Sequence, residues 1–204
     1  FLMELRMDKI YECASMFRKL INSTYYFVVS RNRKTMELVL DFEETDFRHI
    51  SGLHYIDDID IERNPQKILS AIISKKITDE VLEKSQKYKA DKLYEGGSIK
   101  NRVHEMRYLE KYLDVDNFIR IYEMQDFGSM IKADYFIEST LKDRNNTAYI
   151  FLRKRKESDH YVIVSFFEKH QAYQGVNLYW MLKKKKDCTG IIELYRNQNY
   201  KCNA

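Results

Sequence analysis

The segment Asp46–Tyr55 holds two of the five histidines of this 204-residue chain, His49 and His54, next to the cation Arg48. Histidine has an unperturbed pKa of about 6.5, so it accepts and donates protons near neutral pH. Two such side chains beside a cation are what acid–base chemistry on a phosphodiester requires. The segment therefore predicts a catalytic centre. The alternative interpretation is that His54 is a hydrogen-bonded residue of the core.

The two histidines are poorly spaced for a metal site. They are five positions apart, or about 140° around a helix, so a continuous helix would not place them on one face. Zinc sites on helices use histidines at i and i+4 together with a third ligand. Asp57, Asp58 and Asp60 could offer oxygen atoms, but no motif connects them to the histidines. We therefore expect a site without a metal or any other cofactor.

Cleavage of RNA suits these residue types, because the ribose 2′-OH is itself the nucleophile. The enzyme then supplies a base for the 2′-OH proton, an acid for the leaving 5′-oxygen, and cations for the charge on the phosphorus centre. Side chains of these kinds are abundant in the second half of the chain. Beside the two histidines, we take Arg153 and Ser165 as catalytic candidates. The candidates for substrate binding are Arg48, Lys132, Tyr149, Lys154, His170 and Tyr173.

Several of these residues also have an ordinary structural interpretation. Ser165 belongs to an apolar run, where a lone hydroxyl needs a hydrogen-bond partner. The basic runs Arg153–Lys156 and Lys183–Lys186 border predicted turns, where such runs are usually solvated hairpin ends. His104 and His160 are expected on the surface.

Helices are predicted mainly in the first part of the chain, from apolar residues at helical spacing and from capping residues. They are expected over Met3–Ile21, from a cap at Asp46 to a stop at Gly52, after Asn64–Pro65, after a cap at Thr78, and over Ser98–Leu113. β-branched and aromatic residues predict a hairpin over 24–42. The Gly96–Gly97 pair is expected to be a hinge or a disordered tip.

After about residue 116 the pattern changes to short β-branched and aromatic runs between polar turns, which predicts an antiparallel meander. The runs are Asn117–Glu123, Ala133–Thr140, Thr147–Arg153, Tyr161–Phe167, Leu178–Leu182 and Gly190–Arg196. We therefore predict an α+β fold, with N-terminal and central helices packed on a mainly antiparallel C-terminal β-sheet. The length suits a single domain, 1–204, with a helical insertion at about 64–115.

The net charge of +4 hides a strong asymmetry along the chain. Residues 37–62 contain nine acidic side chains and one basic, a net −8, whereas residues 142–201 contain thirteen basic and six acidic, a net +7. This pattern predicts either a basic face for a polyanion or neutralisation of acidic elements by basic ones within the fold. The sixteen tyrosines would suit stacking on unpaired bases where they are exposed, although most must belong to the core.

Composition limits the class of protein. An apolar fraction of 44% is enough for a core, and no run approaches the roughly 18 consecutive apolar residues of a membrane span, so we expect no membrane partner. Three widely spaced cysteines without metal-ligand spacing are typical of a reduced, intracellular protein. The motifs of nucleotide-binding loops, serine hydrolases and zinc proteases are missing, which argues against those classes.

The segment Phe47–Ile56 after a predicted hairpin, with Tyr149–Lys154 leading to Ser165–Phe167, resembles the PBECR4 family. These are phage-associated nuclease domains grouped with barnase, EndoU, colicin E5/D and RelE. The resemblance spans roughly Thr24 to Lys186, and its most specific piece is the pattern F-x-H-x-x-G-L-H. It implies a BECR-like α+β fold and metal-independent RNA cleavage. It also implies that His49, His54, Arg153 and Ser165 occupy motif positions.

We therefore expect a cytoplasmic endoribonuclease of toxin or phage-effector type in a bacterial host cell. It would cleave RNA, with tRNA as one candidate, leave a 2′,3′-cyclic phosphate, and have an antitoxin or immunity protein as a partner. The alternative is a catalytically inert inhibitor of phage anti-defence type, whose acidic segment Glu37–Glu62 mimics nucleic acid against a host nucleoprotein. A further alternative is DNA cleavage, which lacks the 2′-OH and normally requires a metal.

Overall fold

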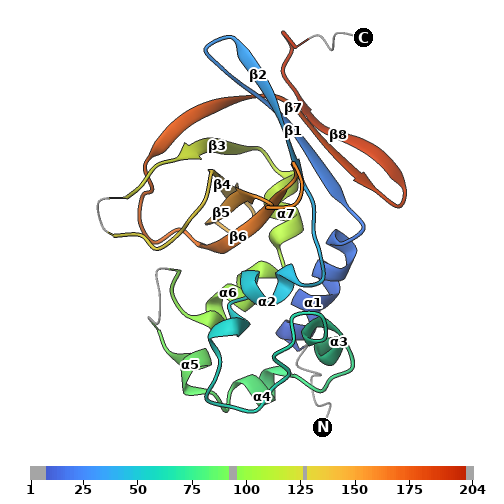
Figure 1. Cartoon of the computed structure of the whole chain (residues 1–204), viewed down its shortest axis with the longest axis vertical. Helices are drawn as coiled ribbons and strands as arrows, with labels where there is room; N and C mark the ends of the chain where they lie inside the picture. Colours follow the sequence, from blue (N-terminus) through green and yellow to red (C-terminus); the bar gives the residue numbers. More distant parts are fainter. Residues whose placement is uncertain (1–7, 92–95, 126–127, 201–204) are drawn as a thin grey trace.

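The computed structural model describes residues 8–91, 96–125 and 128–200, and it has the predicted α+β fold (Figure 1). The strands are β1 (Thr24–Arg31), β2 (Lys34–Leu40), β3 (Asn117–Tyr122), β4 (Tyr135–Leu141), β5 (Asn146–Lys154), β6 (Tyr161–Glu168), β7 (Gly175–Asp187) and β8 (Gly190–Arg196). The helices are α1 (Lys9–Leu20), α2 (Asp46–Ile50), the 3₁₀ helix η1 (Leu53–Tyr55), α3 (Ile68–Ile73), α4 (Asp79–Leu82), α5 (Gln86–Lys89), α6 (Ile99–Met106) and α7 (Leu109–Asp114). Figure 1 shows the strands at one end of the molecule and most helices at the other.

The strands form a closed barrel. Their order is β1–β2–β6–β5–β4–β3–β7, and β7 pairs with β1 to complete the ring, while β8 adds to β7 outside it. Among the described strands, every pairing is antiparallel except the β2–β6 pairing at Leu40 and Tyr161. The prediction of a mainly antiparallel sheet is confirmed. The sheet is not only C-terminal, however, because β1 and β2 are part of the ring.

One continuous hydrophobic core joins the strands to the helices. Val29 of β1, Ile150 of β5 and Phe17 of α1 belong to it and are fully buried. The motif segment also contributes, because Phe47 of α2 and Leu53 of η1 are at most 1% exposed. Burial of a large apolar side chain is worth about 1.5–3 kcal/mol. The backbone that carries His49 and His54 is therefore anchored in the core.

The predicted helix Ser98–Leu113 is divided into α6 and α7 at Arg107 and Tyr108. The guanidinium of Arg107 donates a hydrogen bond to the carbonyl oxygen of His104 at 2.9 Å and another to Glu12 of α1 at 2.6 Å. The side chain thus satisfies a carbonyl at the end of α6 and allows the chain to turn.

Other predicted helix boundaries are confirmed or shifted by a few residues. Thr78 caps α4 as predicted, since its hydroxyl accepts a hydrogen bond from the Val81 N–H. The start signal at Asn64–Pro65 begins a turn, and the helix itself starts at Ile68. Residues 3–7 of the predicted first helix lie outside the described residues.

Strand β7 extends beyond the predicted Leu178–Leu182 at both ends, so the lysine run 183–186 lies within it. The interpretation of this run as a solvated hairpin end is wrong for Lys183 and Lys185, which are 2% and 6% exposed. The Lys183 ammonium donates to the carbonyl oxygens of Leu113 and Val115 at 3.3 and 2.8 Å, and to the Asn117 side-chain oxygen at 3.1 Å. This lysine therefore joins β7 to the chain between α7 and β3.

Replacing Lys183 with Met keeps an unbranched side chain but removes the donor that these oxygen atoms share. Buried acceptors left without a donor cost roughly 1–3 kcal/mol, so we expect Lys183→Met to lower the free energy of unfolding by about that amount. Urea denaturation measures the change. Lys186→Met, at an exposed position of the same strand, is the matched control. Equal effects of the two substitutions would contradict the role given to Lys183.

Candidate active site

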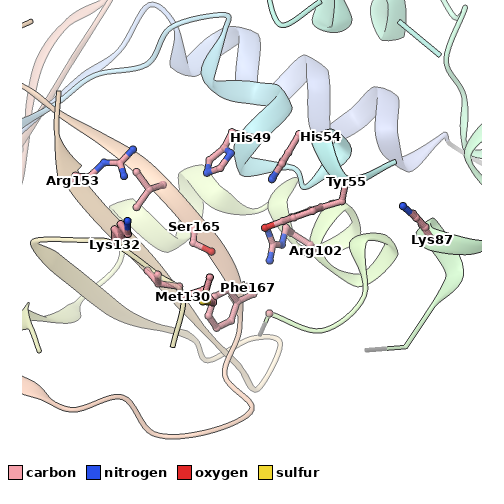
Figure 2. Close-up of a pocket in the computed structure, with 13 residues that line it drawn as sticks. His49, His54, Tyr55, Lys87, Arg102, Met130, Lys132, Arg153, Ser165 and Phe167 are labelled. Atoms are coloured by element: carbon pink, nitrogen blue, oxygen red, sulfur yellow. The ribbon is translucent and has the colours of Figure 1, made fainter. Parts of the chain in front are cut away.

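A cleft of ≈ 650 Å³ lies where the motif segment meets the barrel (Figure 2). Five of the residues predicted from the sequence line it together, namely His49, His54, Lys132, Arg153 and Ser165. Figure 2 shows the two histidines along one side of the cleft and Arg153 and Lys132 at one end. Ser165 lies between the histidines and Phe167. The other lining residues are Tyr55, Lys87, Gly96, Arg102, Met130, Ile131, Val164 and Phe167.

A sharp turn at Gly52 brings the two histidines together. Gly52 ends α2 as predicted, with a φ of +79° that favours glycine. The chain then enters η1, and the His54 ring comes to stack on the His49 ring with their centroids 4.4 Å apart and an interplanar angle of 27°. The five-residue spacing, which would separate the side chains on a continuous helix, thus makes them neighbours across the turn.

Both histidines are held in their neutral form near neutral pH. Burial lowers the pKa of His49, and the positive charges of Arg102 and Arg153 lower it further. Burial and the neighbouring His49 lower the pKa of His54 from 6.5 to about 4. The Nδ1 atom of His54 lies 3.4 Å from the carbonyl oxygen of Arg48. Because a carbonyl only accepts, Nδ1 carries the hydrogen and Nε2 keeps its lone pair.

The barrel side of the cleft comes from β5 and β6. A β-bulge shifts the register of these strands between Phe151 and Leu152, and the facing residues of β6, Val164 and Ser165, both line the cleft. Such bulges re-aim side chains and are frequent next to active sites. Arg153 follows the bulge and is exposed, and its side chain makes no ion pair or hydrogen bond with the residues that the structure describes. Its charge is available to a ligand.

Arg102 is a functional candidate that sequence reasoning missed. It lies on α6, is 5% exposed, and its guanidinium lies 5.8 Å from the centre of the Phe167 ring. Room for it depends on Gly96, because a Cβ at that position would clash with both Arg102 and Phe167, whereas a Cβ at Gly52 would make only an ordinary contact with Arg102. Gly96 is therefore a packing requirement of the site, and the Gly96–Gly97 pair was the signal that could have indicated it.

The remaining predicted residues do not line the cleft. Tyr149 and Tyr173 are buried with Phe136, Phe151 and Phe167 in a second hydrophobic cluster behind it. Lys154 pairs with Asp159 at 2.6 Å, and His170 lies against Gly97. Arg48 contributes its carbonyl oxygen to His54, and it is not among the residues that line the cleft. Their predicted roles in substrate binding stay predictions.

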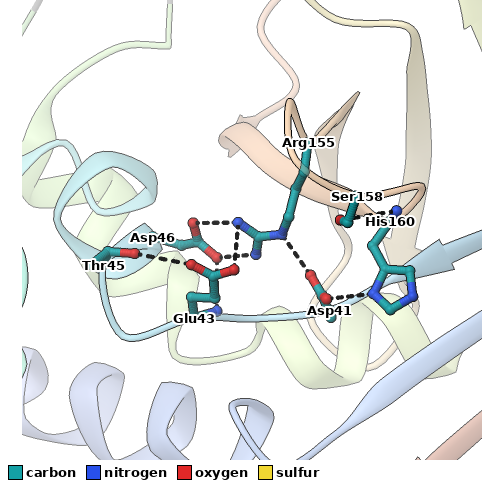
Figure 3. A network of polar contacts seen from close by, with 7 residues as sticks. All are labelled: Asp41, Glu43, Thr45, Asp46, Arg155, Ser158 and His160. Carbon is teal, nitrogen blue, oxygen red and sulfur yellow. Dashed lines mark hydrogen bonds and ion pairs between the residues drawn. The ribbon is translucent and has the colours of Figure 1, made fainter.

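An ion-pair network ties α2 to the barrel (Figure 3). Arg155, just after β5, places its Nε 2.7 Å from Asp41 and its Nη2 2.6 Å from Asp46, and it also pairs with Glu43 at 3.4 Å. Asp46 is therefore the first residue of α2 and a partner of Arg155, not the predicted N-cap, a position taken by Thr45.

The same network corrects one further expectation and adds a partner to a second residue. Arg155 is not the solvated end of a basic run, because its side chain is 14% exposed and surrounded by carboxylates. His160 is on the surface as expected, with its side chain 44% exposed, and its Nδ1 lies 2.6 Å from Asp41. Asp41 follows β2, so the network connects β2, α2 and the β5–β6 hairpin. It thereby holds the helix of His49 against the strand of Arg153.

A cleft in which histidines meet cations on an α+β barrel is suited to a nuclease, and a family model for nucleases matches residues 9–201. That model is PBECR4, described as a phage-Barnase-EndoU-ColicinE5/D-RelE like nuclease, and the chain belongs to this family. The resemblance carried by the motif segment is thus confirmed. Comparisons with curated proteins and with solved structures give no significant match.

Among residues 8–91, 96–125 and 128–200, no three His, Cys, Asp or Glu side chains gather in a way that could hold a metal ion. In the same ranges, the helices all lack the length and apolar character needed to cross a membrane.

Replacing Arg155 with Gln removes the charge that Asp41 and Asp46 share. We expect the free energy of unfolding to fall by about 2 kcal/mol, because carboxylates would lose charge-assisted hydrogen bonds at a partly buried site. Urea denaturation gives this value, and the NMR resonances of the His49 ring should shift as α2 loosens. Lys156→Gln, one position further on and exposed, is the control. If the two variants behave alike, the network does not hold α2.

The lowered pKa of His54 makes folding stability depend on pH. The unfolded chain has the ordinary histidine pKa of 6.5 and the folded protein one of about 4, so between these values the unfolded chain binds more protons. The free energy of unfolding therefore rises with pH across this window, and the stability contributed by neutral His54 is lost as the pH falls through it. We expect His54→Gln to weaken the rise, as measured by urea denaturation on both sides of the window. His170→Gln is the control and should keep the full increase in the free energy of unfolding. If His54→Gln showed the same increase as the wild type, this account would be contradicted.

Proposed function

We propose that the protein is a metal-independent endoribonuclease that cleaves an RNA strand in the cleft of Figure 2. The observation that carries the proposal is that His49 and His54 share one cleft with Arg153 and Ser165, which are distant in the sequence. Membership of a nuclease family supports the same reaction class. RNA is favoured over DNA because its 2′-OH allows cleavage by side chains alone.

In this mechanism His54 is the general base. Its Nδ1–H is directed to the Arg48 carbonyl, which leaves Nε2 to take the proton of the ribose 2′-OH. The lowered pKa keeps His54 unprotonated at neutral pH, so it is ready to accept that proton. The 2′-oxygen then attacks the neighbouring phosphorus atom.

His49 is the general acid. A bound phosphate adds negative charge beside the ring, and a nearby negative charge raises the pKa of an imidazole. Asp46 and a hydrogen bond with the backbone of Val164 act in the same direction on His49. His49 therefore becomes protonated when RNA binds, and it gives its proton to the 5′-oxygen as the P–O5′ bond breaks. The products are a 2′,3′-cyclic phosphate and a 5′-hydroxyl.

Cations and a hydroxyl stabilise the pentavalent phosphorus centre. Arg153 and Lys132 stand at one end of the cleft and Arg102 lies at its base, so positive charge surrounds the position of the phosphate. The Ser165 hydroxyl donates a hydrogen bond to a phosphate oxygen. Fixed donors of this kind in a partly enclosed site are a large source of rate enhancement.

The alternative of an inert nucleic-acid mimic gains no support from the acidic segment. Asp58 accepts hydrogen bonds from Ser85 and from the backbone N–H groups of Gln86 and Lys87, so it caps α5. Asp41 and Asp46 pair with Arg155. These carboxylates hold the fold together, which leaves less charge for a partner. A nuclease of phage or toxin origin, working on RNA in the bacterial cytoplasm and restrained by an antitoxin, fits the family better.

The proposal is tested with purified protein and bacterial tRNA and total RNA in the presence of EDTA. We expect cleavage to persist in EDTA and to leave 2′,3′-cyclic phosphate ends, because the 2′-OH replaces a metal-activated water. His54→Ala should lower the rate by about 100-fold or more, the usual contribution of a general base.

His104→Ala, a half-buried histidine away from the cleft, is the matched control and should keep the wild-type rate. DNA of the same sequence should remain uncut. A chain that never cleaves RNA, or a His54→Ala variant that cuts as fast as the wild type, would show the proposal to be wrong.

A further inference from the structure

One side of the cleft is apolar and solvent-accessible. Tyr55 and Met130 are 40% and 87% exposed, and both line the cleft together with Ile131 and Phe167. Exposed large apolar groups that gather at one place mark binding surfaces more often than isolated ones do. The cleft thus offers an apolar surface directly beside its cations.

Tyr55 is well placed to contact a ligand held by the histidines. It directly follows His54 in η1, and the two ring centroids are 3.8 Å apart. Figure 2 shows its ring reaching into the cleft toward Ser165, with Met130 and Phe167 on the far side. A phosphate bound near the histidines therefore has a flat aromatic ring as a neighbour.

The facing side combines an adaptable side chain with a buried aromatic support. Phe167 stacks on Phe151 with their centroids 5.4 Å apart and an interplanar angle of 29°, and it is 1% exposed, so it supports this side of the cleft from within the core. Met130 is exposed, unbranched and polarisable, so it can fit aromatic groups of different shape. Met130 can therefore contact a planar ring held by Tyr55 without selecting one hydrogen-bonding pattern.

We propose that Tyr55, with Met130 across the cleft, binds one unpaired base of the RNA next to the phosphate that is cleaved. This inference rests on the proposed function and narrows its substrate to unpaired RNA. Bases of single strands can be splayed out and stacked on aromatic side chains, whereas those of a duplex stay inside the helix. The cleft volume of ≈ 650 Å³ lies in the range of pockets that hold compact ligands.

The test uses a short fluorescein-labelled oligouridine whose 2′-OH groups are replaced by fluorine, so that it binds but is not cleaved. A matched strand of the same length lacks the bases and keeps the sugar–phosphate chain. In fluorescence anisotropy we expect Tyr55→Ala to weaken binding of the oligouridine about tenfold, since one stacked base contributes on the order of 1–3 kcal/mol. Binding of the abasic strand should be unchanged.

Two control variants separate stacking from a structural role. Tyr55→Phe keeps the ring and should bind both strands as the wild type does. Tyr11→Ala removes a tyrosine of similar exposure, 36%, on α1 outside the cleft, and should have no effect. A duplex of the same oligouridine with its complement should compete poorly with the single strand.

The outcomes distinguish this inference from the proposed function. The base subsite would be overturned, even if RNA is cleaved, by either of two results. One is that Tyr55→Ala weakens binding of both strands equally, and the other is that the wild type binds the two strands equally well. A Tyr55-dependent preference for the strand with bases would support the subsite. If that preference appeared without any cleavage of RNA, the nuclease mechanism would fail and the base subsite would stand.

Discussion

Strand β1 forms hydrogen bonds along both of its edges, and the site depends on this double pairing. Tyr25 of β1 lies opposite Leu40 of β2 on one side and opposite Lys185 of β7 on the other. The hairpin near the N-terminus is thereby joined to the last part of the barrel. Leu40 then pairs with Tyr161, which brings the chain after β2 to β6. Helix α2 follows at that point, and its histidine arrives beside the strands that carry Arg153 and Ser165.

The site combines arginines, whose positive charge is permanent, with histidines, whose charge depends on pH. Arginines 102 and 153 stay protonated at any physiological pH. Burial and the charge of Arg102 lower the pKa of both His49 and His54, and the charge of Arg153 lowers that of His49 further. The arginine that holds the helix, Arg155, is instead paired with carboxylates. Asp41 and Asp46 of the acidic segment thus neutralise Arg155 of the basic segment in the framework, whereas Arg153 of the same basic segment lines the cleft.

Much of this could be predicted from local sequence patterns. Runs of β-branched and aromatic residues located the strands, and the glycine break at Gly52 predicted the end of α2. Closure of the barrel could not be predicted, because such a run indicates a strand but not its partner. Arg102 was missed because an arginine on a helix normally extends into solvent, and only the missing side chain of Gly96 makes room for it. Lys183 was misread for a related reason: its oxygen partners come from a distant segment.

The closed ring also bears on how the protein is made. Thr24 and Lys186 are partners in the sheet although they lie near opposite ends of the chain. A ribosome must therefore synthesise the chain through β7 before β1 can pair with it, and such distant pairings are slow to form. Until then β1 has one edge open, and the framework around the cleft is incomplete. A cell that translates this chain would thus contain the folded barrel and its cleft only after β7 has been synthesised.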